Sequence, residues 1–549
     1  MDKKAESAYQ RMLRTYKIDV PAFFNAGLDI VDRWASQEPQ KLALIAVDEK
    51  GKQAKRYRFL DLKILSNKFA NVLMALGLKQ GDRGIVMLRN VPEWHVVMVG
   101  MIKLGVIPIP TTTQCTSRDL KYRINRAKAD LVVTDNKNAH KFEEIKSECS
   151  TLKHTLVTER PREGWLSYEQ SISKASSQLH GIERTRSSDP MLIYFTSGTV
   201  GYPKMVLHTQ ASIGIGHVIT AKFWQDLRPD DLFWTISDTG WAKAAWSKLF
   251  GQWAMGSCIF LHDAKQKFDV ALSLNLIKKF GISVFCGSPT VYRLFILEKL
   301  DTHKFPKMRH FISAGEPLNP EVIDKFEKGT GFKIYDGYGQ TETVNQLANY
   351  RFMPIKLGST GRPTPAFSMA IVDDEGNMLP PNTEGNIAIR VKPVRPVGLF
   401  KEYLDDEAEM ATAFRGDWYY TGDKAYIDED GYYWFVGRVD DVIITSGYRI
   451  GPFEVESAVI THPAVVESAV VASPDEIRGE VVKAFVVLKQ GYQPSEALVK
   501  NIQDHVKKVT APYKYPRKIE FVASLPKTIS GKIRRSELKT AEWKDWKRI

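Results

Sequence analysis

The sequence has little cysteine and no long hydrophobic run. Its 549 residues include four cysteines, which are widely spaced and form no Cys-x-x-Cys pair. This spacing argues against a zinc site or a disulfide framework and is typical of a reducing compartment, so we expect a cytoplasmic protein. The longest apolar stretch, residues 96–109, is interrupted by a lysine, a glycine and a proline and is too short to span a bilayer. The first seven residues have no apolar core, so we also expect no secretory signal.

Two classes of motif are missing as well. The sequence contains no Gly-x-x-x-x-Gly-Lys-Ser/Thr pattern, which disfavours a kinase or ATPase of the P-loop type. The net charge is +13, but no RNA- or DNA-binding motif accompanies it. Residues 501–549 alone hold 13 lysines and arginines against 5 aspartates and glutamates. A solvated surface, an anionic membrane or a nucleic acid would each suit this charge, but we predict a phosphate-rich small molecule as the partner.

The pattern of apolar runs predicts at least two domains, because the chain is too long for one hydrophobic core. From about residue 60 to 340, apolar runs of four to seven residues alternate with helical patterns, which indicates parallel sheets covered by helices. After residue 355 short strands and turns, such as the turn at Asp430-Gly431, indicate a small antiparallel sheet or barrel.

The expected fold is therefore a large α/β N-terminal domain followed by a small, mobile α+β domain. The N-terminal domain would span residues 1–437, with parallel sheets, helices and a β-barrel-like antiparallel subdomain at 355–437. Residues 438–441 would form a hinge, and residues 442–549 the C-terminal domain.

A loop rich in glycine and hydroxyl groups follows one of the apolar runs. Residues 196–204 read Thr-Ser-Gly-Thr-Val-Gly-Tyr-Pro-Lys and come directly after the run 191–195. Glycine lets the backbone approach phosphate oxygens, N–H groups and hydroxyls can donate to them, and lysine neutralises their charge. An ordinary turn is the alternative. The predicted phosphate-binding residues are Thr196, Ser197, Gly198, Thr199, Gly201 and Lys204.

Further stretches follow this loop in a fixed order. They read Ser-Ala-Gly-Glu-Pro-Leu (313–318), Tyr-Asp-Gly-Tyr-Gly-Gln-Thr-Glu-Thr (335–343), Tyr-Thr-Gly-Asp (420–423), Gly-Arg-Val-Asp-Asp (437–441) and Pro-Lys-Thr-Ile-Ser-Gly-Lys (526–532). With this combination the chain closely resembles the acyl- and aryl-CoA synthetases of the acyl-adenylate-forming superfamily, over essentially its whole length. The resemblance implies two steps: a carboxylic acid and Mg-ATP form an acyl-AMP and pyrophosphate, and the acyl group then passes to the thiol of CoA.

The resemblance also implies roles for residues of these stretches. Glu342 would hold Mg²⁺, since a carboxylate is the hard oxygen donor that this ion prefers, and Thr341 would contact the α-phosphate. Asp423 would accept from both ribose hydroxyls, and Arg438 would donate to the same sugar. The adenine slot and the remaining ATP contacts would come from Gly315, Glu316, Pro317, Asp336, Gly337, Tyr338, Gly339 and Gln340.

Lys532 is the implied catalytic cation, which would stabilise negative charge that develops during adenylation. Its stretch is an acetylation target in the family, so we hypothesise that a lysine acetyltransferase can remove this charge. Because Lys532 would obstruct the entering thiol, the family rotates the small domain about a hinge, here Asp440. After rotation, the predicted CoA contacts are Ser446, Gly447, Tyr448, Arg449, Arg478, Tyr515, Pro516 and Arg517.

The acid itself is the least determined part of the prediction. Acetate-specific members of the family close the acyl pocket with a tryptophan, and Gly339 stands at that position here. We expect this replacement to open space for a longer or cyclic acid. Trp241, in a segment similar to the medium-chain branch, would line the same pocket, and the role of Lys243 is open. We therefore predict a medium-chain acyl-CoA synthetase. Branched acids, benzoate-type acids and an adenylation enzyme that loads a carrier protein are alternatives, and an oligomer is compatible with the sequence.

Overall fold

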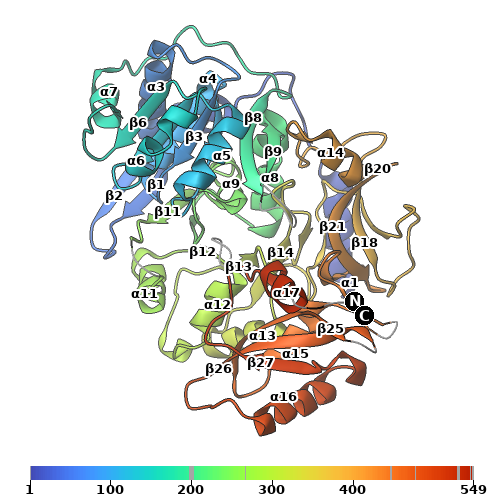
Figure 1. Ribbon diagram of the computed structural model, residues 1–549. Helices are drawn as coiled ribbons and strands as arrows, with labels where there is room; N and C mark the ends of the chain where they lie inside the picture. Colours follow the sequence, from blue (N-terminus) through green and yellow to red (C-terminus); the bar gives the residue numbers. More distant parts are fainter. Residues whose placement is uncertain are drawn as a thin grey trace.

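Two sheets with helices on their faces form the N-terminal part of the molecule (Figure 1). The computed structural model describes residues 2–196, 203–265, 268–445, 448–475, 478–527, 532–544 and 546. Before the sheets come α1 (Lys3–Thr15), η1 (Gly27–Asp32) and α2 (Arg33–Gln37). No helix in these described ranges is long and apolar enough to cross a bilayer.

The first sheet is parallel throughout and has the strand order β4-β3-β5-β6-β7. Its strands are β3 (Arg83–Met87), β4 (Ile107–Pro110), β5 (Leu131–Asp135), β6 (His154–Thr158) and β7 (Leu166–Ser167). The helices of this part are α3 (Phe59–Ala75), α4 (Pro92–Leu104), α5 (Ser117–Ala127), α6 (Ala139–Glu143), η2 (Lys146–Glu148) and α7 (Tyr168–Lys174). The strands are buried, as expected for a sheet covered on both faces.

The second sheet has nine strands in the order β16-β15-β14-β13-β12-β10-β11-β1-β2. The six strands from β14 to β1 are parallel, and the strands at both edges are antiparallel. Their bounds are β1 (Leu42–Val47), β2 (Ala54–Arg58), β10 (Leu232–Thr235), β11 (Cys258–His262), β12 (Val284–Gly287), β13 (His310–Ala314), β14 (Ile334–Tyr338), β15 (Leu347–Ala348) and β16 (Arg362–Pro363). The accompanying helices are η3 (Gln210–Ile215), α8 (His217–Ile219), η4 (Thr220–Trp224), α9 (Ala242–Ser247), α10 (Phe250–Ala254), α11 (Val270–Phe280), α12 (Pro289–Phe295), η5 (Leu300–Thr302) and α13 (Pro320–Thr330).

In the second sheet, the chain changes the side on which it adds the next strand at β10. The chain continues from β10 to β11 on one side and then to β12 on the other, which makes β10 a topological switch point. In open α/β sheets, ligands bind outside the carboxyl ends of the strands at such a point. The loops after β10, β12, β13 and β14 are therefore where this fold places a site.

Two groups of antiparallel strands adjoin the parallel sheets. The predicted phosphate loop joins β8 (Pro190–Thr196) to β9 (Lys204–Thr209), and β19 (Glu402–Tyr403) pairs with β9. A second group of five strands corresponds to the predicted antiparallel subdomain. It consists of β17 (Met369–Val372), β18 (Gly385–Arg390), β20 (Phe414–Arg415), β21 (Trp418–Ile427) and β22 (Tyr433–Arg438), with helix α14 (Glu407–Ala413).

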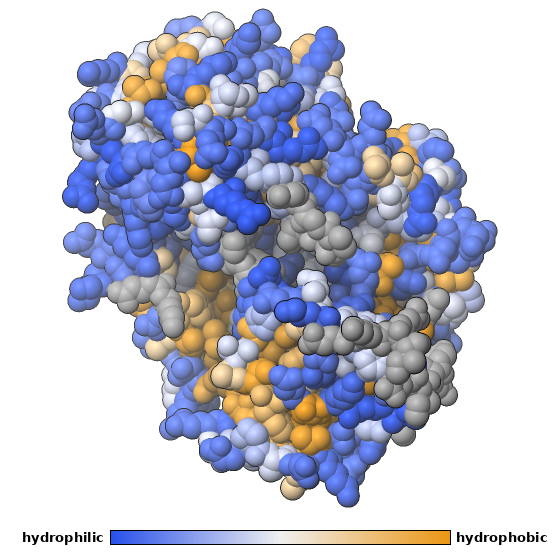
Figure 2. All heavy atoms as spheres, viewed as in Figure 1, coloured by the Kyte–Doolittle hydropathy of each residue, from blue (hydrophilic) through white to orange (hydrophobic). Residues whose placement is uncertain are grey.

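The C-terminal elements form a small α+β unit below the N-terminal sheets in Figure 1. Its strands are β23 (Ile443–Thr445), β24 (Tyr448–Ile450), β25 (Val465–Asp475), β26 (Gly479–Leu488) and β27 (Lys518–Phe521). Its helices are α15 (Pro452–Ile460), α16 (Glu496–Val509), η6 (Pro512–Lys514) and α17 (Arg535–Trp543). The predicted fold class is thereby confirmed. Figure 2 shows a mainly hydrophilic face that is hollowed between the N-terminal sheets and these elements.

Candidate active site

The loop after β13 lies at the carboxyl edge of the second sheet. Gly315 follows the strand with φ +109°, a conformation that residues with a side chain rarely adopt. The chain then presents Glu316, whose carboxylate accepts from Arg293 Nη2 at 2.9 Å and from Thr290 Oγ1 at 3.0 Å. Pro317 is half-buried beside it. The ion pair with Arg293 holds this loop against α12.

Asp423 of β21 connects three of the predicted stretches. Its Oδ2 accepts from Tyr338 Oη at 2.5 Å and from Gln340 Nε2 at 2.9 Å. Arg438 stands opposite it on β22, with Nε 4.0 Å from Oδ1. Burial raises the pKa of Asp423, and this shift is opposed by Arg438, Tyr338, Lys532 and Gln340. A buried carboxylate with donors on several sides is thus preorganised as an acceptor.

Glu342 lies between the second sheet and the β9–β19 pair. Its Oε1 accepts from Tyr403 Oη at 2.9 Å. Burial raises the pKa of Glu342, which the Tyr403 hydrogen bond and the charges of Arg438 and Lys204 oppose. Lys204 at the start of β9 pairs with Glu409 of α14, and its ammonium lies 5.4 Å from the centre of the Tyr403 ring. The predicted magnesium ligand and the predicted phosphate-loop lysine are therefore in one neighbourhood.

Thr341 is held through its backbone. Its carbonyl oxygen accepts from Nε2 of His208 at 2.8 Å. Burial lowers the pKa of His208 to about 4, so the ring is neutral at physiological pH and donates from Nε2. This bond ties the end of the Gln-Thr-Glu segment to β9.

Lys532 extends toward this cluster from the C-terminal unit. Desolvation by the surrounding protein lowers its pKa; Glu316 and Asp423 oppose that shift, and Arg438 and Lys243 add to it. Its side chain is still reached by solvent. Of these neighbours, Glu316, Asp423 and Arg438 are predicted nucleotide residues, and each lies more than 90 positions away from Lys532 in the sequence.

Asp336 and Gly337 occupy the inner end of β14. Burial raises the pKa of Asp336 well above its usual range. Its Oδ1 has no hydrogen-bond partner in the described part of the chain. A β-carbon at Gly337 would lie 2.4 Å from Cε2 of Trp224, so only glycine fits against that indole.

Gly339 stays a predicted residue of the acyl pocket, and the structure shows which side chain lies beside it. A β-carbon on Gly339 would lie 2.2 Å from Cη2 of Trp246, so an indole already fills the space beside it. Trp241 is the half-buried residue that precedes α9. Lys243, whose role was open, donates from Nζ to the carbonyl oxygen of Ala314 at 3.0 Å. Its ammonium therefore faces the end of β13.

The described side chains among the predicted CoA contacts bond to near neighbours in the chain. Arg517 Nη1 donates to Tyr515 Oη at 2.9 Å, next to the buried Pro516, and the Arg478 N–H donates to Asp475. Within the described ranges, no hydrogen bond or ion pair joins these side chains to the nucleotide cluster. Tyr448 and Arg449 belong to β24. The remaining predicted contacts that lie outside the described residues are Ser197, Gly198, Thr199, Gly201, Ser446 and Gly447.

A cationic cavity of about 460 Å³ was missed at the sequence level. It lies where strands of both parallel sheets end, because its lining residues directly follow β3, β4, β5, β10 and β11. Asp238 at its wall accepts from Thr112 Oγ1 at 3.0 Å. In the sequence, the signal that could have indicated this cavity is the basic residue that follows each of three apolar runs within a few positions. The cationic lining residues are Arg89, Lys137, Lys141 and Lys265, and His140 also lines the cavity.

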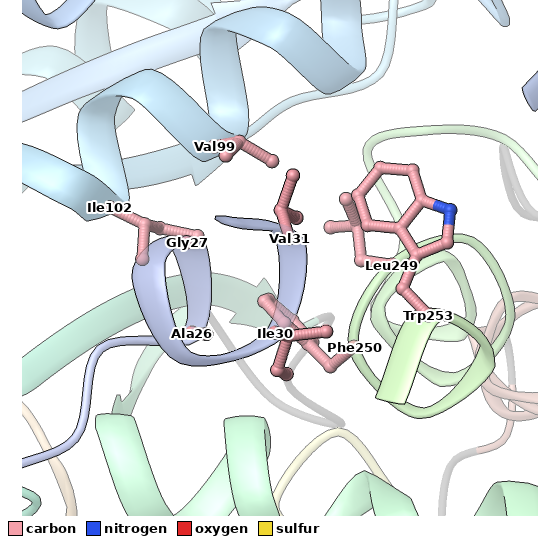
Figure 3. Close-up of a pocket in the computed structure, with 9 residues that line it drawn as sticks. All are labelled: Ala26, Gly27, Ile30, Val31, Val99, Ile102, Leu249, Phe250 and Trp253. Atoms are coloured by element: carbon pink, nitrogen blue, oxygen red, sulfur yellow. The ribbon is translucent and has the colours of Figure 1, made fainter. Parts of the chain in front are cut away.

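A second cavity offers no space for a ligand. It encloses only about 10 Å³ between η1, α4 and α10, and the side chains that point toward it are apolar (Figure 3). A void of this size admits at most one water molecule, so it is a packing feature of the core.

The switch-point site with its buried ribose-type acceptor and surrounding cations defines a nucleotide-binding α/β enzyme. The sequence model of AMP-binding enzymes matches residues 31–404, and that of the AMP-binding enzyme C-terminal domain matches residues 454–532, so the chain belongs to the AMP-binding enzyme family.

Named relatives agree with this assignment. The chain is 48% identical to the human mitochondrial acyl-coenzyme A synthetase ACSM3 over 98% of its own length and 93% of the relative's. It is also 48% identical to human mitochondrial ACSM5, over 95% and 91% of the two chains. Among solved structures, the anthranilate CoA ligase AuaEII in complex with anthranoyl-AMP has a TM-score of 0.88 and 30% identity, over 95% of this chain and 98% of that one.

Proposed function

We propose that this protein is an AMP-forming acyl-CoA synthetase that activates a medium-chain or branched carboxylic acid. ATP and CoA are its co-substrates. The observation that carries the proposal is the buried Asp423 carboxylate, which accepts from Tyr338 and Gln340, lies 4.0 Å from Arg438 and has Lys532 among its electrostatic neighbours. This arrangement supports a nucleotide held by the N-terminal residues with a cation supplied from the C-terminal unit.

The nucleotide would lie along the carboxyl ends of β13 and β14. Asp423 would accept from the ribose hydroxyls and Arg438 would donate to them, while the Gly315–Pro317 loop and residues 336–340 would enclose adenine. Burial of Asp336 favours its protonated form, and its Oδ1, which has no hydrogen-bond partner in the described part of the chain, supports a polar contact with the base. Lys204, now paired with Glu409, would exchange that partner for the outer phosphates.

Glu342 fits a magnesium ion, because Tyr403 occupies one of its oxygens and leaves carboxylate lone pairs available. Mg²⁺ is commonly bound by one or two carboxylates together with substrate phosphates. When bound there, the ion would neutralise phosphate charge. Lys532 would donate to the carboxylate and the α-phosphate as negative charge builds up between them, which typically lowers such a barrier by about 3 kcal/mol.

CoA would bind after the C-terminal unit rotates about Asp440. We propose that the 460 Å³ cationic cavity receives part of the phosphate-bearing end of CoA, in addition to the contacts predicted from Tyr448, Arg449, Arg478, Tyr515, Pro516 and Arg517. Several cations around a polar cavity suit a ligand that carries three phosphate groups. Ser446 and Gly447 remain predicted contacts of the pantetheine arm.

The test is AMP release by the purified full-length protein with acids from acetate to octanoate, benzoate and 2-methylbutyrate, with and without CoA. We expect AMP release at high turnover only when both an acid and CoA are present. No AMP release with any acid would overturn the proposal. Activity with a carrier protein but not with CoA would instead support an adenylation enzyme, and preference for benzoate an aryl-CoA ligase.

Three further predictions accompany this function. The cytoplasmic location stays a prediction, and the human relatives are named as mitochondrial. Acetylation of Lys532 would remove its charge and stop adenylation. We also retain small-molecule partners without nucleic acid, and an oligomer, as predictions.

A further inference from the structure

Two short arms of the chain flank the stretch that ends in Lys532. Lys527 and Ile533 pair in an antiparallel bridge, and the N–H of Arg534 donates to the carbonyl oxygen of Pro526 at 2.9 Å. Ile533 also packs on the apolar cluster formed by β25 and β26. Lys532 directly precedes the second arm, so the position of its backbone depends on how firmly these arms are held to the C-terminal unit.

Arg535, at the start of α17, anchors the second arm from inside the C-terminal unit. Its Nε donates to Oε1 of Glu456 on α15 at 2.9 Å, and its Nη2 donates to Oε2 at 2.6 Å. Oε1 also accepts from the N–H of Val470 on β25 at 2.8 Å. Only 5% of the Glu456 side chain is exposed. A buried, bidentate arginine–carboxylate pair fixes orientation as well as distance and is screened little by salt.

The other cations of the two arms have weaker anchors. Lys527 Nζ lies 2.9 Å from Oε1 of Glu467 on β25, through a single contact. Arg534 pairs with Glu537 at 2.8 Å, and both of these side chains are more than half exposed. Surface pairs of this kind contribute little. Among the three cations, Arg535 is the least exposed and has the most buried partner.

Arg535 also lies near the region where the C-terminal unit meets the N-terminal site. Its electrostatic neighbours include Asp441, which follows the proposed hinge residue, and Glu316 of the loop after β13. Glu316 is an electrostatic neighbour of Lys532 as well. The anchored arginine and the predicted catalytic lysine therefore share one carboxylate of the predicted nucleotide site as a neighbour.

We propose that Arg535, held by Glu456, is the positioning residue for Lys532 during adenylation; this inference rests on the proposed function. A cation lowers the barrier most when it is already fixed where negative charge develops. A misplacement of about 1 Å can cost about a hundredfold in rate. Arg535 acts indirectly, because it fixes the start of α17 relative to α15 and β25, and this start follows Lys532 closely in the chain.

The experiment measures acid-dependent exchange of radiolabelled pyrophosphate into ATP and, separately, thioester formation from supplied acyl-AMP. Arg535→Met alone would leave the Glu456 carboxylate buried without its partner, which also destabilises the fold. The double variant Glu456→Gln with Arg535→Met removes both charges, while the glutamine oxygen can still accept from the Val470 N–H. We expect kcat for exchange to fall at least about tenfold with little change in KM for ATP, and thioester formation to be largely retained.

Arg535→Lys tests rescue by a conservative change. It keeps the charge pair with Glu456 but loses the bidentate geometry, so exchange should lie between that of the wild type and that of the double variant. Arg534→Met is the matched control, because it removes the adjacent arginine with its exposed ion pair, and it should leave exchange unchanged.

The Lys532→Ala background tests whether Arg535 acts through Lys532. There the Glu456→Gln and Arg535→Met changes should cause less than about a twofold further loss of exchange, because the side chain to be positioned is absent. A purely structural role would instead give the same further loss in both backgrounds.

Thermal melts identify folded variants. Unchanged exchange, equal loss of both half-reactions, or an undiminished further loss in the Lys532→Ala background would each overturn the inference. If the double variant does not fold, Arg535→Lys decides with the same two assays and the same background. Absence of exchange in the wild-type protein with any acid overturns the proposed function instead.

Discussion

At the scale of single residues, Asp423 shows how the site is prepared before a ligand arrives. Tyr338 and Gln340 both donate to Oδ2, and Gln340 is itself held by Tyr419 Oη at 3.1 Å and by the carbonyl oxygen of Thr421 at 2.7 Å. A carboxylate fixed in this way loses little freedom when it accepts from a ligand. Such preorganisation favours binding because fewer groups must be ordered.

Replacing Lys532 should separate the two half-reactions. Lys532→Ala removes the cation that we place at the developing charge, so ATP–pyrophosphate exchange should fall at least about a hundredfold. Thioesterification of supplied acyl-AMP should be largely retained. This substrate has already passed adenylation, which is the step in which the negative charge develops. Lys500→Ala removes an exposed lysine of α16 as a control and should change neither. Equal loss of both half-reactions in Lys532→Ala would contradict this role.

Tyr403 should tune the ionisation of Glu342. Burial raises the pKa of Glu342, and the hydrogen bond from Tyr403 opposes that rise. Tyr403→Phe should therefore raise the pKa further. If the ionised carboxylate binds Mg²⁺, the acid limb of kcat/KM for Mg-ATP should move to higher pH. Tyr432→Phe is the control, because its hydroxyl donates to Pro354 instead. An acid limb that does not move in Tyr403→Phe would exclude this coupling.

At the scale of elements, a short connection separates β22 from β23 and carries the proposed hinge. The carbonyl oxygen of Asp440 accepts from Nζ of Lys539 on α17 at 3.2 Å. Asn319, which precedes α13, donates to Ser457 Oγ of α15 at 2.8 Å. These are polar contacts rather than an extended apolar interface, although Asn319 itself is buried, and they support a docking that can be released.

Stiffening this connection should slow the second half-reaction. The Asp440 N–H donates no hydrogen bond within the described ranges, so Asp440→Pro mainly restricts rotation about φ. We expect ATP–pyrophosphate exchange to persist while overall thioester formation slows at least about tenfold. Asp440→Ala keeps that rotation and should remain near wild type. Normal thioester formation in Asp440→Pro would argue against a hinge at this residue.

Local patterns predicted most regular elements, but not what packs across the site. The helical patterns at 92–104 and 270–280 correspond to α4 and α11, because apolar patterns of helical length and the glycines that follow them are local signals. The β8–β9 pairing around the loop and the π-helices η3 and η4 were not predicted. Trp246 and the cationic cavity depend on contacts between distant segments, so local patterns did not reveal how their residues come together.

At the scale of the whole molecule, several histidines are buried in neutral form. His95, His208, His217 and His310 are inaccessible to solvent. Burial lowers the pKa of His95 and His310 to about 3 and that of His208 to about 4, and lowers the pKa of His217 well below its usual value. The folded state therefore binds fewer protons than the unfolded state below about pH 6.5.

Acid should consequently destabilise the fold before its carboxylates titrate. Each such histidine adds stability that is fully present above pH 6.5 and is lost, at about 1.4 kcal/mol per pH unit, as the pH falls toward its native pKa. His310→Gln should flatten this dependence, because a glutamine amide can still donate to the carbonyl oxygen of Trp224, which His310 Nε2 contacts at 2.9 Å. Urea unfolding at pH 7.5 and pH 5 measures the difference, with the exposed His180→Gln as the control. Equal pH dependence in His310→Gln and the wild type would show that this histidine does not contribute.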